Sequence, residues 1–332
     1  MSQKTIDLED IIFSEEQRIE YANGDIFVGQ FDGGKPIHGK YTSNSGNVYE
    51  GPFVDGLPHG EGQQTFKSGD VYVGNFVDGI PTGHGIHTRI RDGNVYEGYF
   101  VGGNIENGTL TYRNGDIYVG QFAYVIPHGY GIYTRIRDGN VYEGDFVGGN
   151  IENGTLTYHN GDVYVGQFED GDPDGHGTLT YKNGNVYEGG FEDGLPFGHG
   201  ILTYQNGDVY EGGILDGEQD GHGIFTYQNG DVYVGGFLYG LYHGMGTLTY
   251  QNEDVYVGNF RKGLYHGNGT LTYQNGDVYD GLFNKGRRNG DFRITRNGIT
   301  KQVTYFNDVA KSISRRAGGS KRRKHRRTKR KK

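Results

Sequence analysis

The chain has 332 residues, of which 33% are hydrophobic, and it contains 63 glycines and no cysteine. The lack of cysteine excludes disulfides and thiol chemistry, and the low apolar content is poor material for a thick core. The net charge of −9 hides a segregation, because residues 311–332 hold 13 Lys and Arg and no acid, which leaves residues 1–310 at −22.

Residues 1–17 follow no regular pattern, and we expect an N-terminal cap or a flexible arm there. A short helix starting at Ser14 is one alternative, and a segment that covers the first strand is another. The segment lacks the basic stretch and apolar run of a signal peptide, and no run of about 18 apolar residues is present anywhere. These features predict a protein that is neither secreted nor membrane-spanning, located in the cytoplasm, in the nucleus or in a virion.

Residues 18–306 are a tandem array. The pattern Tyr-x-Gly-x-Phe recurs twelve times at steps of 22–24 residues, with aromatic first positions at Phe27, Tyr49, Tyr72, Tyr96, Tyr118, Tyr142, Tyr164, Tyr187, Tyr210, Tyr233, Tyr256 and Tyr279. A fixed period of about 20–50 residues is typical of repeat architectures, in which each unit packs mainly on its neighbours. We therefore expect one elongated domain.

Each unit predicts two short strands rich in β-branched and aromatic residues, Val-Tyr-x-Gly-x-Phe and Gly-x-Leu-Thr-Tyr. Asn-Gly, as in Asn229-Gly230, separates the second strand from the next unit and predicts a tight type I′ hairpin turn. The other connection, such as 238–243, predicts a longer loop. Hairpin after hairpin gives an antiparallel meander.

Strand alternation places the Tyr, Gly and Phe of the motif on one face. Because glycine in a strand often marks a close approach by another group, we expect aromatic rings to lie in the hollows over the glycines and to shield a single-layer sheet. The residues given this structural role are Tyr49, Gly51, Phe53, Tyr72, Gly74, Phe76, Tyr96, Gly98, Phe100, Tyr118, Gly120, Phe122, Tyr142, Gly144, Phe146, Tyr164, Gly166, Phe168, Tyr187, Gly189, Phe191, Tyr233, Gly235, Phe237, Tyr256, Gly258 and Phe260.

Residues 85–122 and 131–168 match at all but four positions, at an offset of two units. Each copy has one extra residue in the turn at 91–94 or 137–140, and one residue fewer in the following segment at 102–108 or 148–154. A slip of one residue would send every side chain to the wrong face. The compensation therefore favours a sheet whose register is restored.

The array resembles the MORN (membrane occupation and recognition nexus) repeat, whose Tyr-x-Gly-x-Trp/Phe is followed by His-Gly-x-Gly, as at His59, His128, His243 and His266. Other units place the histidine between the glycines, at His84, His176, His199 and His222, and Phe or Ile214 replaces Trp throughout. The resemblance implies a long, twisted, single-layer antiparallel sheet of about twelve hairpins. It also implies phospholipid binding, which the charge of −22 on the array opposes.

Catalytic and metal chemistry is poorly supported. Histidines one unit apart would be about 9–10 Å apart, too far for shared zinc ligation at about 2 Å. Glu188 and Glu211 have the same wide spacing, beyond most acid/base pairs. No serine lies between Ser68 and Ser312, and the calcium-binding nine-residue period is absent. We predict a non-enzyme without cofactor or metal.

Residues 307–314 predict a short capping helix, and residues 315–332 a disordered basic tail. The tail has three competing roles: nucleic-acid binding, nuclear import and attraction to an anionic membrane. It resembles tails of proteins from large DNA viruses. Its candidate polyanion-binding residues are Lys321, Arg322, Arg323, Lys324, Arg326, Arg327, Lys329, Arg330, Lys331 and Lys332.

These observations favour a structural or scaffolding protein that binds an unidentified protein partner through the sheet and uses the tail as an electrostatic tether. The alternatives are a nucleic-acid-associated or nuclear-targeted binder that acts through the tail, and a module that tethers membranes. Open sheet edges pair readily with other chains, so a homodimer is a further option.

Overall fold

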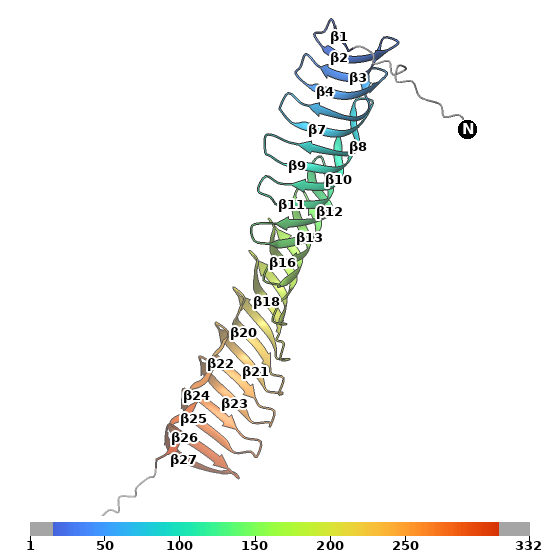
Figure 1. Ribbon diagram of the computed structural model, residues 1–332. Coiled ribbons are helices and arrows are strands. Elements are labelled where there is room, and N and C mark those ends of the chain that lie inside the picture. The colour runs from blue at the N-terminus through green and yellow to red at the C-terminus, as the bar shows by residue number, and fades with distance from the viewer. Residues whose placement is uncertain (1–15, 312–332) are drawn as a thin grey trace, which may run out of the picture. The chain divides into compact units, whose positions relative to one another are not determined.

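The computed structural model describes residues 16–311 (Figure 1). The chain divides into two compact units at Glu218/Gln219. All regular structure in the described residues is β-strand. None of the described residues forms a helix that could cross a membrane.

In the first unit, successive strands pair antiparallel in a single layer, except that β5 and β6 both pair with β4. Its strands are β1 (Gln17–Glu20), β2 (Ile26–Asp32), β3 (Lys35–Thr42), β4 (Val48–Val54), β5 (Leu57–Pro58), β6 (Gly60–Thr65), β7 (Val71–Val77), β8 (Ile80–Thr88), β9 (Val95–Val101), β10 (Asn104–Thr111), β11 (Ile117–Ala123), β12 (Ile126–Arg135), β13 (Asn140–Val147), β14 (Asn150–Thr157), β15 (Val163–Glu169), β16 (Asp172–Thr180), β17 (Val186–Glu192), β18 (Leu195–Thr203) and β19 (Val209–Leu215).

The second unit repeats this arrangement from β20, which begins at the boundary. Its strands are β20 (Glu218–Thr226), β21 (Val232–Leu238), β22 (Leu241–Thr249), β23 (Val255–Arg261), β24 (Leu264–Thr272), β25 (Val278–Asn284), β26 (Arg287–Arg296), β27 (Ile299–Phe306) and β28 (Val309–Ala310). The prediction of an all-β antiparallel sheet built from tandem hairpins is confirmed.

The two kinds of turn are the reverse of the prediction. The connection expected to be a long loop is a two-residue turn, with positive φ at both Asp78 and Gly79 (51° and 83°), which is the type I′ geometry. The Asn-Gly segment instead lies in a five-residue connection, as at Tyr273–Asp277, where only Gly276 has positive φ. Asp-Gly and Asn-Gly both suit a type I′ turn, so the dipeptide alone does not determine which connection is the two-residue turn. The other residues of each connection determine it.

The second strand of each unit is longer than predicted because it contains a bulge. Gly74 pairs with Gly85, but Phe76 pairs with Pro81, so β8 has two more residues than β7 in this stretch. A bulge interrupts the ladder and bends the strand. The Pro-x-x-Gly segment, expected to be a loop, is therefore part of the sheet.

The duplicated stretch confirms the predicted compensation but places it differently. The turn from β8 to β9 has the extra residue, whereas the turn at Gly102-Gly103 keeps the usual two. The residue lost is one of the two bulge residues, because Tyr99 pairs with Asn107 and Phe100 with Ile105. The register then returns with Tyr118 opposite Leu110.

The ends of the array differ in part from the expectation. Residues 299–306 form the final long strand, as predicted, but the chain then turns and Val309–Ala310 form β28 rather than a capping helix. Gln17–Glu20 form strand β1. The remaining parts of the predicted N-terminal cap and of the 307–314 segment, and the whole 315–332 tail, lie outside the described residues.

Candidate functional surfaces

The inner face of the sheet is an aromatic layer made by the motif residues. Each of the nine predicted Tyr is at most 3% exposed, and each of the nine Phe at most 9%. Their rings meet edge to face, both within a unit and with the next unit, as in Tyr72 with Phe76 at 5.2 Å and with Phe100 at 5.0 Å. Such contacts add to the free energy gained by burying the rings.

The glycines make room for the tyrosine rings, as the sequence suggested. A Cβ atom added to Gly177 would lie 2.3 Å from Cε2 of Tyr164, and one added to Gly166 would lie 2.3 Å from the Tyr164 hydroxyl oxygen. The ring thus lies over the paired glycines of two strands. In units that begin with Tyr96 and Tyr142, Ile105 and Ile151 are buried on this face as well, and the Ile105 side chain covers the glycine pair in the first of them.

The tyrosine hydroxyl stabilises the two-residue bulge. Tyr164 donates to the backbone carbonyl of Gln167 at 2.7 Å, and seven other tyrosines do the same at 2.7–3.3 Å with the carbonyl three residues on. These are Tyr49, Tyr72, Tyr118, Tyr187, Tyr210, Tyr233 and Tyr256. Burial raises the pKa of Tyr164 to about 12, because the low-dielectric face disfavours the phenolate.

Units with a one-residue bulge use their aromatic residue differently. Phe27 has no hydroxyl, and its strand pairs through a one-residue shift. Tyr96 accepts a hydrogen bond from Arg89 at 2.9 Å, and Arg135 lies 5.0 Å from the ring centre of Tyr142. A cation over an aromatic face is attracted by the ring quadrupole, so this inner face can hold a guanidinium.

A row of Asp and Asn residues, each at or just before the start of a unit's first strand, joins successive units. Asp162 Oδ1 accepts the backbone N–H of Lys182 at 2.7 Å, and Asp231 accepts that of Gln251 at 2.8 Å. Equivalent bonds, each to the backbone 19 or 20 residues ahead, are made by Asp25, Asn47, Asp70, Asn94, Asp116, Asn140, Asn185 and Asp254. The sequence analysis missed this role, although the fixed position of Asp or Asn after Asn-Gly was a visible signal.

The candidate catalytic and metal residues are not brought together. Glu188 and Glu211 are separated by a strand, since Ile201 pairs with both. His176 and His199 lie opposite Gly190 and Gly213 of the following strands. Within residues 16–311, no three His, Asp or Glu side chains form a group that could hold a metal ion.

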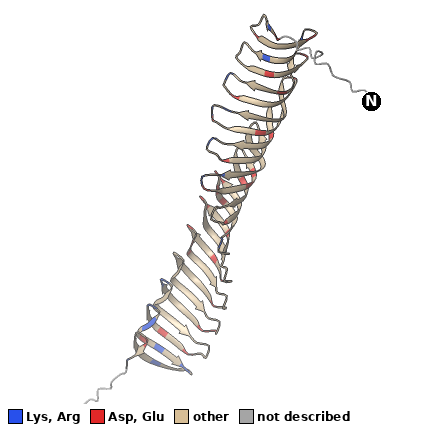
Figure 2. Ribbon diagram, viewed as in Figure 1, with Lys and Arg blue, Asp and Glu red and all other residues tan. Residues whose placement is uncertain are grey.

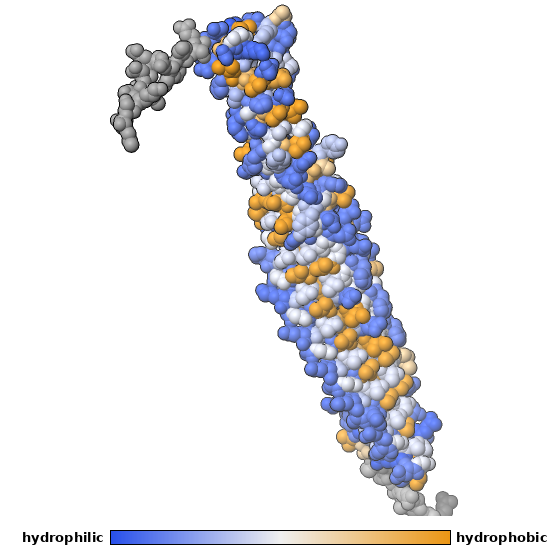
Figure 3. Space-filling model, turned by 90° about the vertical axis from the view of Figure 1, so that its right-hand side faces the viewer, coloured by the Kyte–Doolittle hydropathy of each residue, from blue (hydrophilic) through white to orange (hydrophobic). Residues whose placement is uncertain are grey.

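The outer face carries exposed aliphatic residues at a repeated position. Val73, Val119 and Val165 are 45%, 48% and 52% exposed, and Ile86 and Ile132 pair with the first two across the ladder. In Figure 3, hydrophobic residues form patches that recur along the face turned to the viewer. Regularly spaced apolar patches of this kind often mark interaction sites.

Charge is unequally shared between the two units. Residues 16–218 have 29 Asp and Glu against 10 Lys and Arg, whereas residues 219–311 have 8 against 9. Basic residues gather on β26 and β27 of the second unit (Figure 2). They are Arg287, Arg288, Arg293, Arg296 and Lys301, and the predicted tail residues that would extend them lie outside the described part.

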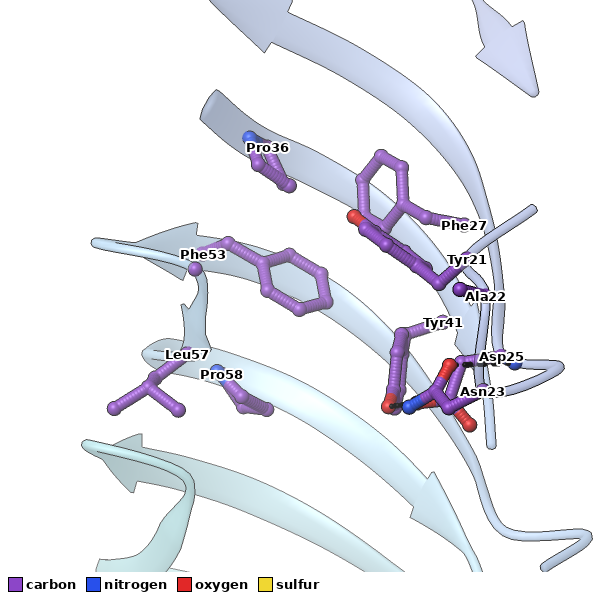
Figure 4. Close-up of a pocket in the computed structure, with 11 residues that line it drawn as sticks. Tyr21, Ala22, Asn23, Asp25, Phe27, Pro36, Tyr41, Phe53, Leu57 and Pro58 are labelled. Atoms are coloured by element: carbon purple, nitrogen blue, oxygen red, sulfur yellow. Dashed lines mark hydrogen bonds between the residues drawn. The ribbon is translucent and has the colours of Figure 1, made fainter. Parts of the chain in front are cut away.

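A cavity of about 680 Å³ opens on the inner face at the start of the first unit (Figure 4). Its walls include the side chains of Tyr21, Phe27, Tyr41, Phe53 and Pro58, and Asp25 is the one charged residue in the lining. Asp25 accepts hydrogen bonds from the Tyr41 hydroxyl and from the Asn44 backbone. The hydrogen bond from Tyr41 lowers the pKa of Asp25. We call this cavity the N-terminal cleft.

The MORN repeat family model matches nine segments, 49–71, 72–89, 118–136, 142–163, 164–186, 187–209, 210–232, 233–255 and 256–278. These segments make up more than half of the chain. The fold, the buried Tyr-Gly-Phe face and this match together define a repeat protein, and the chain belongs to the MORN repeat family.

No curated protein sequence matches the chain. Among solved structures, it is similar to the TCP10 domain of Danio rerio CPAP in complex with a peptide of Danio rerio STIL, at 11% identity, TM-score 0.20, and coverage of 87% of this chain and 97% of that one. It is also similar to the TCP10c domain of Drosophila melanogaster Sas-4, at 13% identity, TM-score 0.19 and coverage of 65% and 96%. With TM-scores this low, neither likeness carries a functional argument.

Proposed function

We propose that this protein is a non-catalytic scaffold that binds protein partners through the outer face of its sheet. The supporting observation is the repeated row of exposed aliphatic residues, exemplified by Val119 and Ile132, on a face that also presents polar positions. The inner tyrosines are already committed to packing over the glycines. The outer face therefore offers an extended, regularly patterned surface.

The repeat geometry suits this role because the surface can grow without a larger core. Each unit packs on its two neighbours, and the Asp162 type of hydrogen bond fixes one turn to the next. A solenoid of this kind presents a long surface to its partner. Catalysis, in contrast, needs convergent groups held in one pocket, and Glu188 and Glu211 lie on separate strands with another strand between them.

A crosslinking experiment tests the proposal. The full-length chain would carry a photoreactive tyrosine analogue in place of Tyr130, whose side chain shares the outer face with Ile132 and is 54% exposed. In extract from the native source we expect a discrete protein adduct. The adduct should disappear when Val119 and Ile132 are replaced by Thr, the residue that β16 has at the position of Ile132.

The matched control places the same analogue at Tyr124, which is 83% exposed in a two-residue turn. An adduct that forms equally from both positions, or that survives the two Thr substitutions, would contradict a role for the outer face. Reaction turnover by the purified chain on any small molecule would contradict the non-catalytic part of the proposal.

A polyanion-binding function is the second candidate, and the basic residues of β26 and β27 favour it. Arg287, Arg293 and Lys301 lie on strands that directly precede the Lys- and Arg-rich residues 312–332. Neutralised phosphates release counterions, so DNA affinity should fall steeply with salt. Binding to duplex DNA and to anionic vesicles would be compared; stronger binding to vesicles would favour membrane tethering. The likeness of the tail to viral proteins stays a prediction.

A further inference from the structure

The N-terminal cleft lies in the unit that has an unusually small residue at one repeat position. The residue after the last threonine of the second strand is Tyr in seven units, Arg in three and Phe in one, but in the first unit it is Ser43. Elsewhere this side chain packs on the next unit, as Tyr227 does on Tyr242, with hydroxyl oxygens 2.5 Å apart. Ser43 instead bonds to the backbone of Asn47.

The surroundings of the cleft fit a guanidinium group. The rings of Tyr21, Tyr41 and Phe53 surround the opening, with Pro58 beside them and Asp25 at the edge (Figure 4). The lining contains one carboxylate and no cation. A planar guanidinium can stack on aromatic rings and pair with a carboxylate at the same time.

The same inner face already holds arginine elsewhere. Arg288 lies 4.5 Å from the ring centre of Tyr305 and 3.0 Å from Asp308 Oδ1. Arg135 lies 5.0 Å from the ring centre of Tyr142 and 3.2 Å from Asp138 Oδ2. Both sites combine an aromatic face with a carboxylate. The cleft has the same two groups, and its Asp25 also accepts hydrogen bonds from Tyr41, Asn23 and Asn44.

The chain itself contains a segment of matching chemistry. Residues 312–332 hold seven Arg and five Lys without any acid, and the described part of the first unit has an excess of 19 acids over bases. Charge complementarity of this size steers association. It also makes association sensitive to salt.

Each copy of the chain has one cleft, lined by residues between 21 and 58, and one basic segment, which follows β28. A contact between two unlike surfaces is heterologous, so it can join copies in a series. We propose that the N-terminal cleft binds an arginine of residues 312–332 from another copy of this chain, so that copies associate head to tail.

Sedimentation velocity of the full-length, nuclease-treated chain tests the proposal. We expect self-association that increases with protein concentration and weakens at high ionic strength. The Ser43→Tyr variant should weaken association about tenfold. The equivalent Tyr227 packs on Tyr242, whose counterpart Pro58 lines the cleft, so a tyrosine at position 43 should compete with the arginine. The matched control, Ser68→Asn, introduces the residue usual at that turn position and should leave association unchanged.

A second variant separates guanidinium recognition from net charge. Replacing the seven arginines of residues 312–332 by lysine preserves the charge but removes the planar group, and association should weaken several-fold. A labelled peptide of residues 312–332 should also bind wild type more tightly than Ser43→Tyr. Unchanged association in either full-length variant, a monomer at all concentrations, or tail binding that is independent of concentration would overturn the proposal. This inference does not depend on the outer-face partner.

Discussion

Replacing Gly177 by alanine tests whether the ring-over-glycine packing holds the sheet together. The three atoms nearest to the added Cβ would all belong to Tyr164, at 2.3–2.6 Å, whereas ordinary contacts begin at about 3.4 Å. The ring would have to move by about 1 Å from a site where the side chain is fully buried. Overpacking of this kind costs about 3 kcal/mol.

The cost should be local, because repeat units interact mainly with their neighbours. Hydrogen exchange should accelerate on β15 and β16 and stay unchanged on β4, and the free energy of chemical unfolding should fall by about 3 kcal/mol. Thr178→Ala, on the outer face of the same strand, serves as the control and should cost less than about 1 kcal/mol.

A double-mutant cycle adds the sharper test. In a Tyr164→Ala background the clash partner is absent, so Gly177→Ala should cost about 2 kcal/mol less than in the wild type. If Gly177→Ala is equally harmful in both backgrounds, or harmless in the wild type, the glycines do not serve to seat the tyrosine rings.

Three further predictions follow from the same contacts. Tyr164→Phe should destabilise the chain by about 1 kcal/mol through loss of the bond to Gln167, whereas Tyr142→Phe should not lose a bulge hydrogen bond; chemical unfolding of the two variants measures the difference. Asp162→Ala should cost about 1–2 kcal/mol and speed exchange of the Lys182 amide, because its acceptor is removed. The pKa of Tyr164 is about 12 in the folded state against about 10 in the unfolded state, so the folded state holds this proton more tightly. The resulting contribution to the free energy of unfolding is fully present below pH 10 and should be lost as the pH rises towards 12. Tyrosinate absorbance and circular dichroism, recorded together, would show the loss.

The sequence predicted the sheet and its buried face because side chains along a strand alternate between the two faces with a period of two residues. Tyr72, Gly74 and Phe76 must share a face in any strand, and repetition over twelve units makes the assignment robust. The turns were predicted wrongly because Asn-Gly and Asp-Gly carry the same local preference. The bulge, which lengthens β8, is stabilised by a hydrogen bond from the Tyr72 hydroxyl to the Asn75 carbonyl, and secondary-structure preferences of single residues do not report such a bond.

The candidate surfaces were less visible than the fold. Asp162 accepts a hydrogen bond from the next turn, 20 residues ahead in the sequence. The regular spacing of Asp and Asn suggests such a contact, but only the structure shows that the two turns are adjacent. The unit of the N-terminal cleft differs from the others at Ser43, and comparison of the repeats with one another would have revealed this difference. The outer-face valines could be placed by alternation, but their exposure depends on the absence of a second layer.

The coupling between turn length and bulge size has a consequence for how such a chain evolves. A six-residue turn before β9 is tolerated because the bulge that follows in β10 is one residue shorter. A duplication that copied only the longer turn or only the shorter bulge would exchange the two faces of the later strands. A duplication that copied both could lengthen the protein without this effect. The 46-residue offset of the duplicated stretch therefore marks a genetic unit that selection could retain whole.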